Sequence, residues 1–76
     1  MASKRNNRDP GLLDVVALLA DLQADGLARG QVGTVVELLA PDSALVEFSD
    51  DDGKAYAVAA CPTDKLLVLR YTRRAA

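Results

Sequence analysis

The stretch Gly30-Gln31-Val32-Gly33-Thr34-Val35-Val36-Glu37 decides the fold of this chain. Two glycines bracket one valine and then open directly into a β-branched run. This pattern is typical of a tight turn that leads into a strand. We therefore predict a strand over residues 32–39 at the centre of a small barrel.

The two faces of this strand follow from the two-residue period of β structure. If Glu37 faces solvent, the period places Thr34, Val36 and Leu38 toward the core. A bulge at Gly33 would shift this assignment by one residue.

The length of the chain allows one small domain. At 76 residues, only about 60% of the unfolded surface can be buried. We expect a polar basic arm over residues 1–11, one domain over residues 12–71 and a basic tail over residues 72–76. The single cysteine and the absence of histidine exclude an internal disulfide and argue against a zinc site.

Charge is distributed unevenly along the sequence. All 11 acidic residues lie between residues 9 and 69, together with Arg29, Lys54 and Lys65, so this body has a net charge of 3 − 11 = −8. The remaining basic residues lie at the two ends. Short basic tails can contact nucleic acid or an acidic partner, although most such termini are simply solvated.

The segment LLDVVALLADL, residues 12–22, fits two structures. Its periodicity alone favours an amphipathic helix, with apolar residues at i, i+3, i+4 and i+7. The elements that follow are all strand-like, and a barrel needs a first strand. We therefore predict a strand over residues 14–19, without assigning its buried face.

The remainder of the chain reads as short strands joined by turns. A long loop over residues 21–31 places Leu27 as an apolar plug over the barrel end, and Phe48 is expected to anchor the core. Further strands are predicted at 44–49, 54–60 and 66–71, with turns at 41–43 and 50–53 and one 3-10 turn at 62–65. The predicted fold is an all-β, five-stranded SH3-like barrel.

Several of these segments carry a family resemblance. The residues are Asp14-Val15-Val16-Ala17-Leu18, Gly26-Leu27, Gly30, Val32 to Glu37, Val46-Glu47-Phe48, and Pro62 with Leu66. Over residues 12–69 the chain resembles a family of short bacterial proteins grouped as domain-of-unknown-function 4926. The resemblance implies an SH3-like barrel and no established activity. Residues 30–37 are also similar to the KOW motif of ribosomal and transcription-elongation proteins.

The chain offers few groups for chemistry. Aligning Gly53 with the glycine of a calcium-binding EF-hand loop puts Phe48 and Ala59 at ligand positions, so the Asp50 to Asp52 run reads as a solvated hairpin tip. Cys61 has no histidine to form its thiolate, and nearby Asp64 would oppose ionisation, which favours a half-buried structural thiol. We predict no catalytic residue, no metal site and no cofactor.

These observations favour a non-catalytic protein-interaction module, such as an accessory subunit or an antitoxin-like partner of a neighbouring gene's product. A protein partner is expected and a homodimer stays open. Without a membrane span or a targeting segment, the expected location is the cytoplasm. The candidate partner surface consists of Asp25, Leu27, Arg29, Asp50, Asp51, Asp52, Tyr56 and Tyr71.

The alternative function is nucleic-acid binding through the KOW-like strand and the tails. Its candidate contacts are Lys4, Arg5, Arg8, Arg73 and Arg74. Binding of this kind depends on basic residues that meet phosphates, so the acidic body disfavours it.

Overall fold

The computed structural model describes residues 9–69, and within that range every regular element is a strand or a short 3-10 turn. The prediction of an all-β, five-stranded domain is confirmed. The strands are β1 (Val15–Leu18), β2 (Val32–Leu39), β3 (Ser43–Ser49), β4 (Ala55–Pro62) and β5 (Leu66–Val68). The 3-10 turns are η1 (Gln23–Asp25), which was not predicted, and η2 (Thr63–Lys65), which was.

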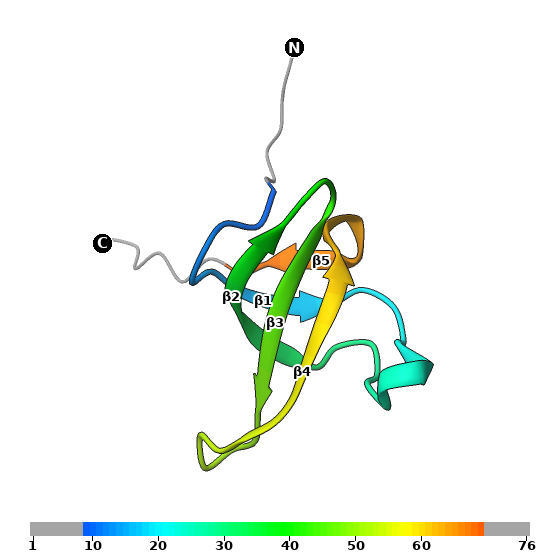
Figure 1. Ribbon diagram of the computed structural model, residues 1–76. Coiled ribbons are helices and arrows are strands. Elements are labelled where there is room, and N and C mark those ends of the chain that lie inside the picture. The colour runs from blue at the N-terminus through cyan, green and yellow to red at the C-terminus, as the bar shows by residue number, and fades with distance from the viewer. Residues whose placement is uncertain (1–8, 70–76) are drawn as a thin grey trace, which may run out of the picture.

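The strands form one antiparallel sheet with the order β4-β3-β2-β1-β5. Strand β1 pairs with β2 on one side and with β5 on the other. Figure 1 shows β2, β3 and β4 crossing in front of β1 and β5, so the sheet folds back on itself. The core lies between these two layers.

The first segment is a strand, as the context of the chain predicts, and the helical periodicity of residues 12–22 is misleading. In β1 the side chains of Val16 and Leu18 are buried, while those of Val15 and Ala17 lie on the other face and are only partly covered. This alternation has the period of two that a strand requires. The buried face of β1, which the sequence did not assign, therefore carries Val16 and Leu18.

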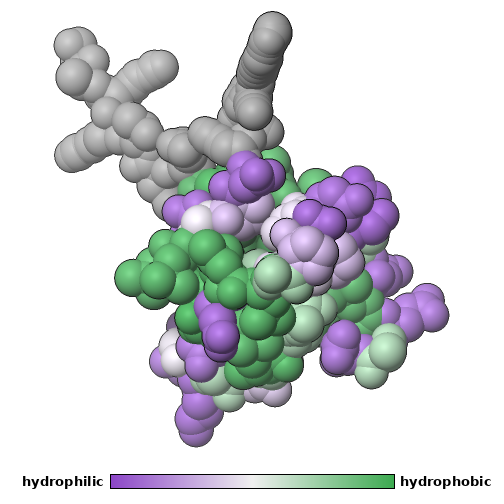
Figure 2. Space-filling model, turned by 45° about the horizontal axis from the view of Figure 1, so that its top comes forward, coloured by the Kyte–Doolittle hydropathy of each residue, from purple (hydrophilic) through white to green (hydrophobic). Residues whose placement is uncertain are grey.

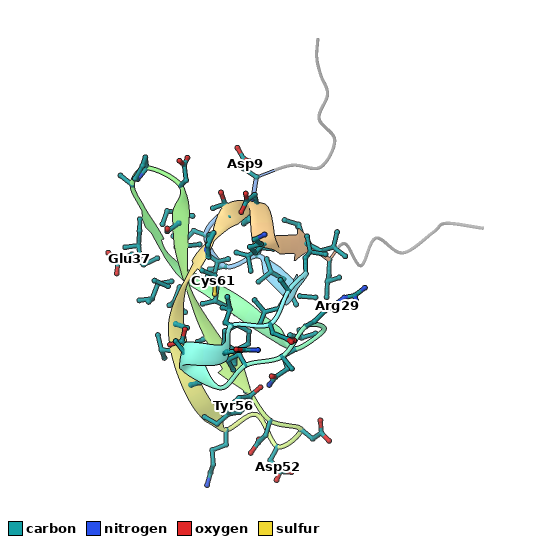
Figure 3. The ribbon with its side chains drawn as sticks, turned by 90° about the vertical axis from the view of Figure 1, so that its right-hand side faces the viewer. Asp9, Arg29, Glu37, Asp52, Tyr56 and Cys61 are labelled. Atoms are coloured by element: carbon teal, nitrogen blue, oxygen red, sulfur yellow. The ribbon has the colours of Figure 1, made fainter. Side chains whose placement is uncertain are left out.

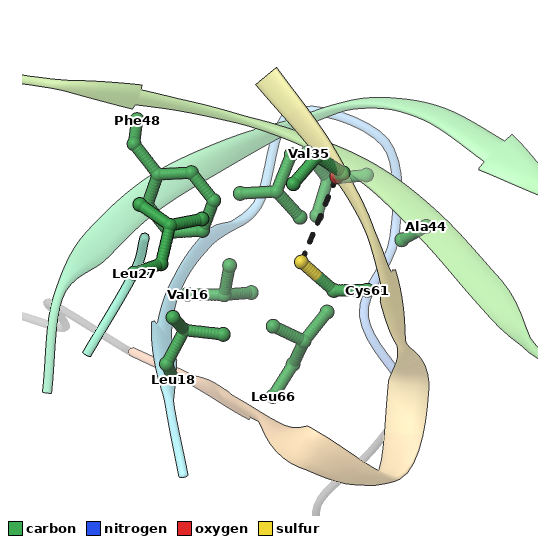
Figure 4. Packing of buried hydrophobic residues seen from close by; sticks show 10 residues of the cluster. Val16, Leu18, Leu27, Val35, Ala44, Phe48, Cys61 and Leu66 are labelled. Carbon is green, nitrogen blue, oxygen red and sulfur yellow. Dashed lines mark hydrogen bonds between the residues drawn. The ribbon is translucent and has the colours of Figure 1, made fainter. Parts of the chain in front are cut away.

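The core is apolar throughout the described residues. Phe48 is fully buried and Leu27 is 4% exposed, which confirms the expected anchor and plug. Figure 4 shows Leu27 against the ring of Phe48. Burying a side chain of this size stabilises a fold by about 1.5–3 kcal/mol. The core comprises Val16, Leu18, Leu27, Val35, Ala44, Val46, Phe48, Ala59, Cys61 and Leu66.

A bulge in β2 overturns the predicted faces of that strand. Val35 pairs with Val46 but Glu37 pairs with Leu45, so Val36 is an extra residue between two ladder positions. The buried positions are therefore Gly33 and Val35, and Thr34 and Val36 do not point into the core as predicted. Leu38 pairs with buried Ala44 and so lies on the inner face as predicted. Its side chain is nevertheless 53% exposed.

Gly33 has a packing role rather than a turn role. A Cβ atom on Gly33 would lie 2.6 Å from Val46 Cγ1 and 2.7 Å from the carbonyl oxygen of Glu47. Only a residue without a side chain fits where β2 passes this closely over β3. Gly30, by contrast, has a φ of 91° and supplies the turn into β2.

The turn between β2 and β3 lies where the proline predicts it. Its Ala40–Pro41 peptide bond is cis, and β3 begins at Ser43. The carbonyl oxygen of Asp42 accepts a hydrogen bond of 2.9 Å from the backbone N–H of Thr63. This bond joins the β2–β3 turn to η2.

Candidate interaction surface

The acidic β3–β4 tip is built around one aspartate. The Asp50 Oδ1 atom accepts hydrogen bonds from the backbone N–H groups of Asp52 and Lys54, each at 2.9 Å. Gly53 has a φ of 80° and donates its own N–H to the Asp50 carbonyl oxygen at 2.9 Å. The Asp50 carboxylate therefore organises the turn, whereas the carboxylates of Asp51 and Asp52 project into solvent.

The β1–β2 loop is also organised by its own polar groups. Leu22 and Leu27 form an isolated antiparallel bridge that closes the loop around η1. The Asp21 carboxylate accepts a hydrogen bond of 2.8 Å from the backbone N–H of Arg29, and the Gln31 side-chain amide donates to the Tyr56 hydroxyl. The loop is therefore held closed and is tied to the beginning of β4.

This loop lies beside the free edge of β4. Strand β4 is the last strand of the sheet and pairs only with β3. Figure 1 shows η1 on the side of β4 that faces away from β3. A loop in this position obstructs the addition of another strand to β4.

The structure separates the predicted partner residues into three groups. Asp25, Arg29, Asp51, Asp52 and Tyr56 are exposed, as a partner surface requires. Leu27 is a core residue, so its assignment to that surface is corrected: its side chain fills the gap beside Phe48. Asp50 is exposed, but its carboxylate is engaged in the turn.

Two further sets of predictions lie outside the described residues. They concern Tyr71 and the basic contacts Lys4, Arg5, Arg8, Arg73 and Arg74. Among the remaining candidates, Figure 3 shows Tyr56 and Asp52 at the same end of the molecule.

Cys61 is buried more completely than the sequence predicts. Its side chain has no exposed surface, and its Sγ atom lies 3.6 Å from the carbonyl oxygen of Ala59. Burial raises the pKa of the Cys61 thiol, and the negative charge of Asp25 raises it further. The opposing charge thus comes from the β1–β2 loop and not from Asp64. A thiol in this environment is not a nucleophile.

Among residues 9–69, no group of three or more histidine, cysteine, aspartate or glutamate side chains is placed to hold a metal ion. Within the same range, no helix has the length and apolar character that a membrane crossing requires.

The outer face of β2, β3 and β4 carries an apolar surface that the sequence analysis missed. Across the sheet, Glu37 pairs with Leu45 and Leu45 with Ala60, while Thr34 pairs with Glu47 and Glu47 with Val58. Val58 is 53% exposed and Val36, at the bulge, is 39% exposed. Figure 2 shows hydrophobic surface gathered on the side of the molecule that carries β2. We define the outer-sheet patch as Val36, Glu37, Leu45, Glu47, Val58 and Ala60.

Leu13 lies beside β2 and has a strained backbone. The N–H of Asp14 donates to the carbonyl oxygen of Gly11 at 3.0 Å, and Leu13 occupies the third position of this turn with a φ of 69°. Glycine or asparagine normally occupies that position. The Leu13 N–H donates to the Val35 carbonyl oxygen at 2.8 Å, and its side chain is 70% exposed. A large apolar side chain is thus held next to the bulge of β2.

The register of the sheet, rather than any local motif, brings the patch together. Counted back from an outward Glu37, strict alternation turns Val36 inward, and the bulge that the sequence suggested was at Gly33 and not at Val36.

Comparison with known proteins gives one match. The model of a family described as Domain of unknown function (DUF4926) matches residues 12–68. No curated protein and no solved structure matches the chain. The matched range includes all five strands, and the description of the family assigns no activity.

Proposed function

This chain belongs to the DUF4926 family, whose description assigns no activity, and we propose that it is a non-catalytic protein-interaction module. It acts as an accessory subunit or as an antitoxin-like partner of a neighbouring gene's product. The proposal includes an SH3-like barrel as its scaffold and the cytoplasm as its location.

One observation carries the proposal: much of the apolar material of this small domain lies on its outside. Nine large hydrophobic side chains are exposed among the described residues, three of them on β2 alone. Single exposed hydrophobic residues are normal, whereas a contiguous group marks an interaction site. Two of the nine, Val36 and Val58, lie on the outer-sheet patch, and half-buried Leu45 on β3 lies between their strands.

Two side chains that could take part in catalysis have structural roles in this fold. The Cys61 thiol is buried in the core, and the Asp50 carboxylate is bonded to its own turn. These placements support a binding role over a catalytic one.

The order of the elements supports the SH3-like scaffold. The long connection between β1 and β2 and the 3-10 turn before β5 were both expected for that fold. The support is one of topology and does not depend on the family match.

A capture experiment tests the function. The tagged full-length chain is incubated with nuclease-treated lysate of its source organism, and retained proteins are identified by mass spectrometry. We expect one partner in a fixed stoichiometry with the tagged chain. An empty lane, with material retained only when nuclease is omitted, would replace the proposal by nucleic-acid binding.

A further inference from the structure

We propose that the outer-sheet patch docks a partner protein segment in which lysine or arginine side chains are flanked by apolar ones, as on one face of a basic amphipathic helix. This inference rests on the proposed function and assigns its surface and the chemistry of its partner.

The apolar part of the argument comes from the register of the sheet. Val36 and Leu45 lie in adjacent strands at the bulge, and Leu45 is directly opposite exposed Ala60. Val58 lies two residues away from Ala60 on the same face. Small and medium side chains thus form a continuous surface across three strands, against which an apolar stripe can pack.

The charge of the partner follows from two glutamates within this surface. Glu37 is opposite Leu45, and Glu47 is two residues further along β3 on the same face, so the two carboxylates lie on neighbouring strands of the patch. No basic residue between 9 and 69 lies on the paired strands of the patch. Arg29 is in the β1–β2 loop, Lys54 is at the β3–β4 tip and Lys65 is in η2.

A partner that covers this face must therefore compensate two carboxylates. Covering them without cations would strip their water and leave like charges buried together, which is strongly unfavourable. Basic side chains at the corresponding positions would turn this cost into a favourable, oriented contact.

The same charges argue against the other occupants of such a face. A second copy docked face to face would bring four carboxylates together. Nucleic acid and anionic lipid headgroups would each be repelled by Glu37 and Glu47. A basic, partly apolar protein segment is the occupant that fits both features of the patch.

The direct test uses a defined probe. The isotope-labelled full-length chain is titrated with a synthetic amphipathic helical peptide of leucine and lysine, and separately with its leucine–glutamate counterpart, and backbone amide shifts are followed by NMR. We expect the lysine peptide to shift amides of Val36, Leu45, Val58 and Ala60, and the glutamate peptide to leave them unchanged.

Two matched double variants locate the charges. Glu37→Gln with Glu47→Gln removes two carboxylates from the patch, and Asp51→Asn with Asp52→Asn removes two from the β3–β4 tip. The proposal expects the first pair to raise the Kd for the lysine peptide at least tenfold and the second pair to change it less than twofold. Equal weakening by both pairs, or shifts confined to the tip, would overturn it.

The same variants separate this inference from the proposed function. If the lysate partner binds wild-type protein and the tip variant but not the Glu37/Glu47 variant, both stand. If the partner binds all three equally, the chain is an interaction module that uses a different surface, and the inference fails. A dimer of the wild-type protein that buries the outer-sheet patch, detected by analytical ultracentrifugation and by amide shifts on the patch, would also contradict it.

Discussion

The β3–β4 tip and the outer-sheet patch both involve strands β3 and β4, but their side chains are used in opposite ways. At the tip, the Asp50 carboxylate bonds the backbone of its own turn. On the patch, Val36 and Val58 expose apolar surface that the fold does not cover. The tip thus satisfies polar groups of its own turn, whereas the patch leaves apolar side chains in contact with solvent.

This difference teaches that the most conspicuous stretch of a sequence need not be its binding site. Three consecutive aspartates attract attention, yet one is committed to forming a turn. Val36 looks like an ordinary core residue and lies outside because of one bulge. An interaction surface is therefore better sought where register and packing leave side chains uncovered.

The largest expected effect disrupts the strand that connects the two layers. Gly33→Ala places a Cβ against Val46 and the Glu47 carbonyl oxygen, and we expect a loss of about 3 kcal/mol in the free energy of unfolding. Urea denaturation followed by circular dichroism measures it. Gly11→Ala is the control, because its Cβ would make an ordinary 3.5 Å contact, and it should change stability by less than about 0.5 kcal/mol.

The second prediction tests whether the tip is self-contained. Asp50→Ala removes the acceptor of two backbone N–H bonds and should cost about 1–2 kcal/mol of unfolding free energy. Asp51→Ala keeps both bonds and should be close to neutral in the same assay. Equal losses from the two variants would mean that charge, and not the turn, stabilises the tip.

A smaller effect of opposite sign is expected beside the patch. Leu13→Gly relieves a left-handed backbone that costs roughly 1–2 kcal/mol, and the flexibility of glycine returns about 0.5–1 kcal/mol of that. The net result is a stabilisation of about 0.5–1 kcal/mol, read as a higher thermal midpoint. Leu12→Gly, where no positive φ exists, should destabilise by about 0.5–1 kcal/mol. The idea fails if both variants lose stability.

The smallest effect concerns how the free energy of unfolding depends on pH, which involves the β1–β2 loop and not the patch. The Cys61 thiol has a raised pKa in the folded chain, so above about pH 8.5 the unfolded chain releases a proton that the folded chain retains. Stability should therefore fall as pH rises through this range, and it should not be affected by the thiol at lower pH. Urea midpoints between pH 7 and pH 10 show the decline, which Cys61→Ala should remove.

The Asp25 charge is the second cause of that raised pKa. Asp25→Asn should therefore end the decline at a lower pH and reduce the total loss of stability, while Glu47→Gln should leave both unchanged. An identical end point and total loss in wild type and Asp25→Asn would show that burial alone acts on the thiol.

Local signals in the sequence were sufficient for β2, β3 and the turn into β4, whereas β1 was predicted from its context and η1 was not predicted. The β-branched run after Gly33 predicted β2, the alternation around Phe48 predicted β3, and the glycine after three aspartates predicted the turn into β4. Each of these signals acts within a few residues, through backbone preference or the two-residue period of a strand. The membership of the family could likewise be identified from short matching segments.

The errors arose where tertiary fit overrides local pattern. The bulge at Val36 depends on how β2 bends over the core, and a run of β-branched residues does not show which of them is extra. Leu27 was correctly placed as a plug and wrongly kept as a partner residue, because one side chain cannot serve both roles. The outer-sheet patch could not be predicted at all, since it exists only once three strands are in register.

The position of η1 beside β4 has a consequence for colloidal behaviour. Strand β4 contains no charged residue and ends the sheet. An uncharged terminal strand is the kind of template on which chains stack into fibrils. The Gln31–Tyr56 hydrogen bond ties the β1–β2 loop to the beginning of this strand. We therefore expect that breaking this bond would free the edge of β4 and raise the tendency of a concentrated solution to form fibrils.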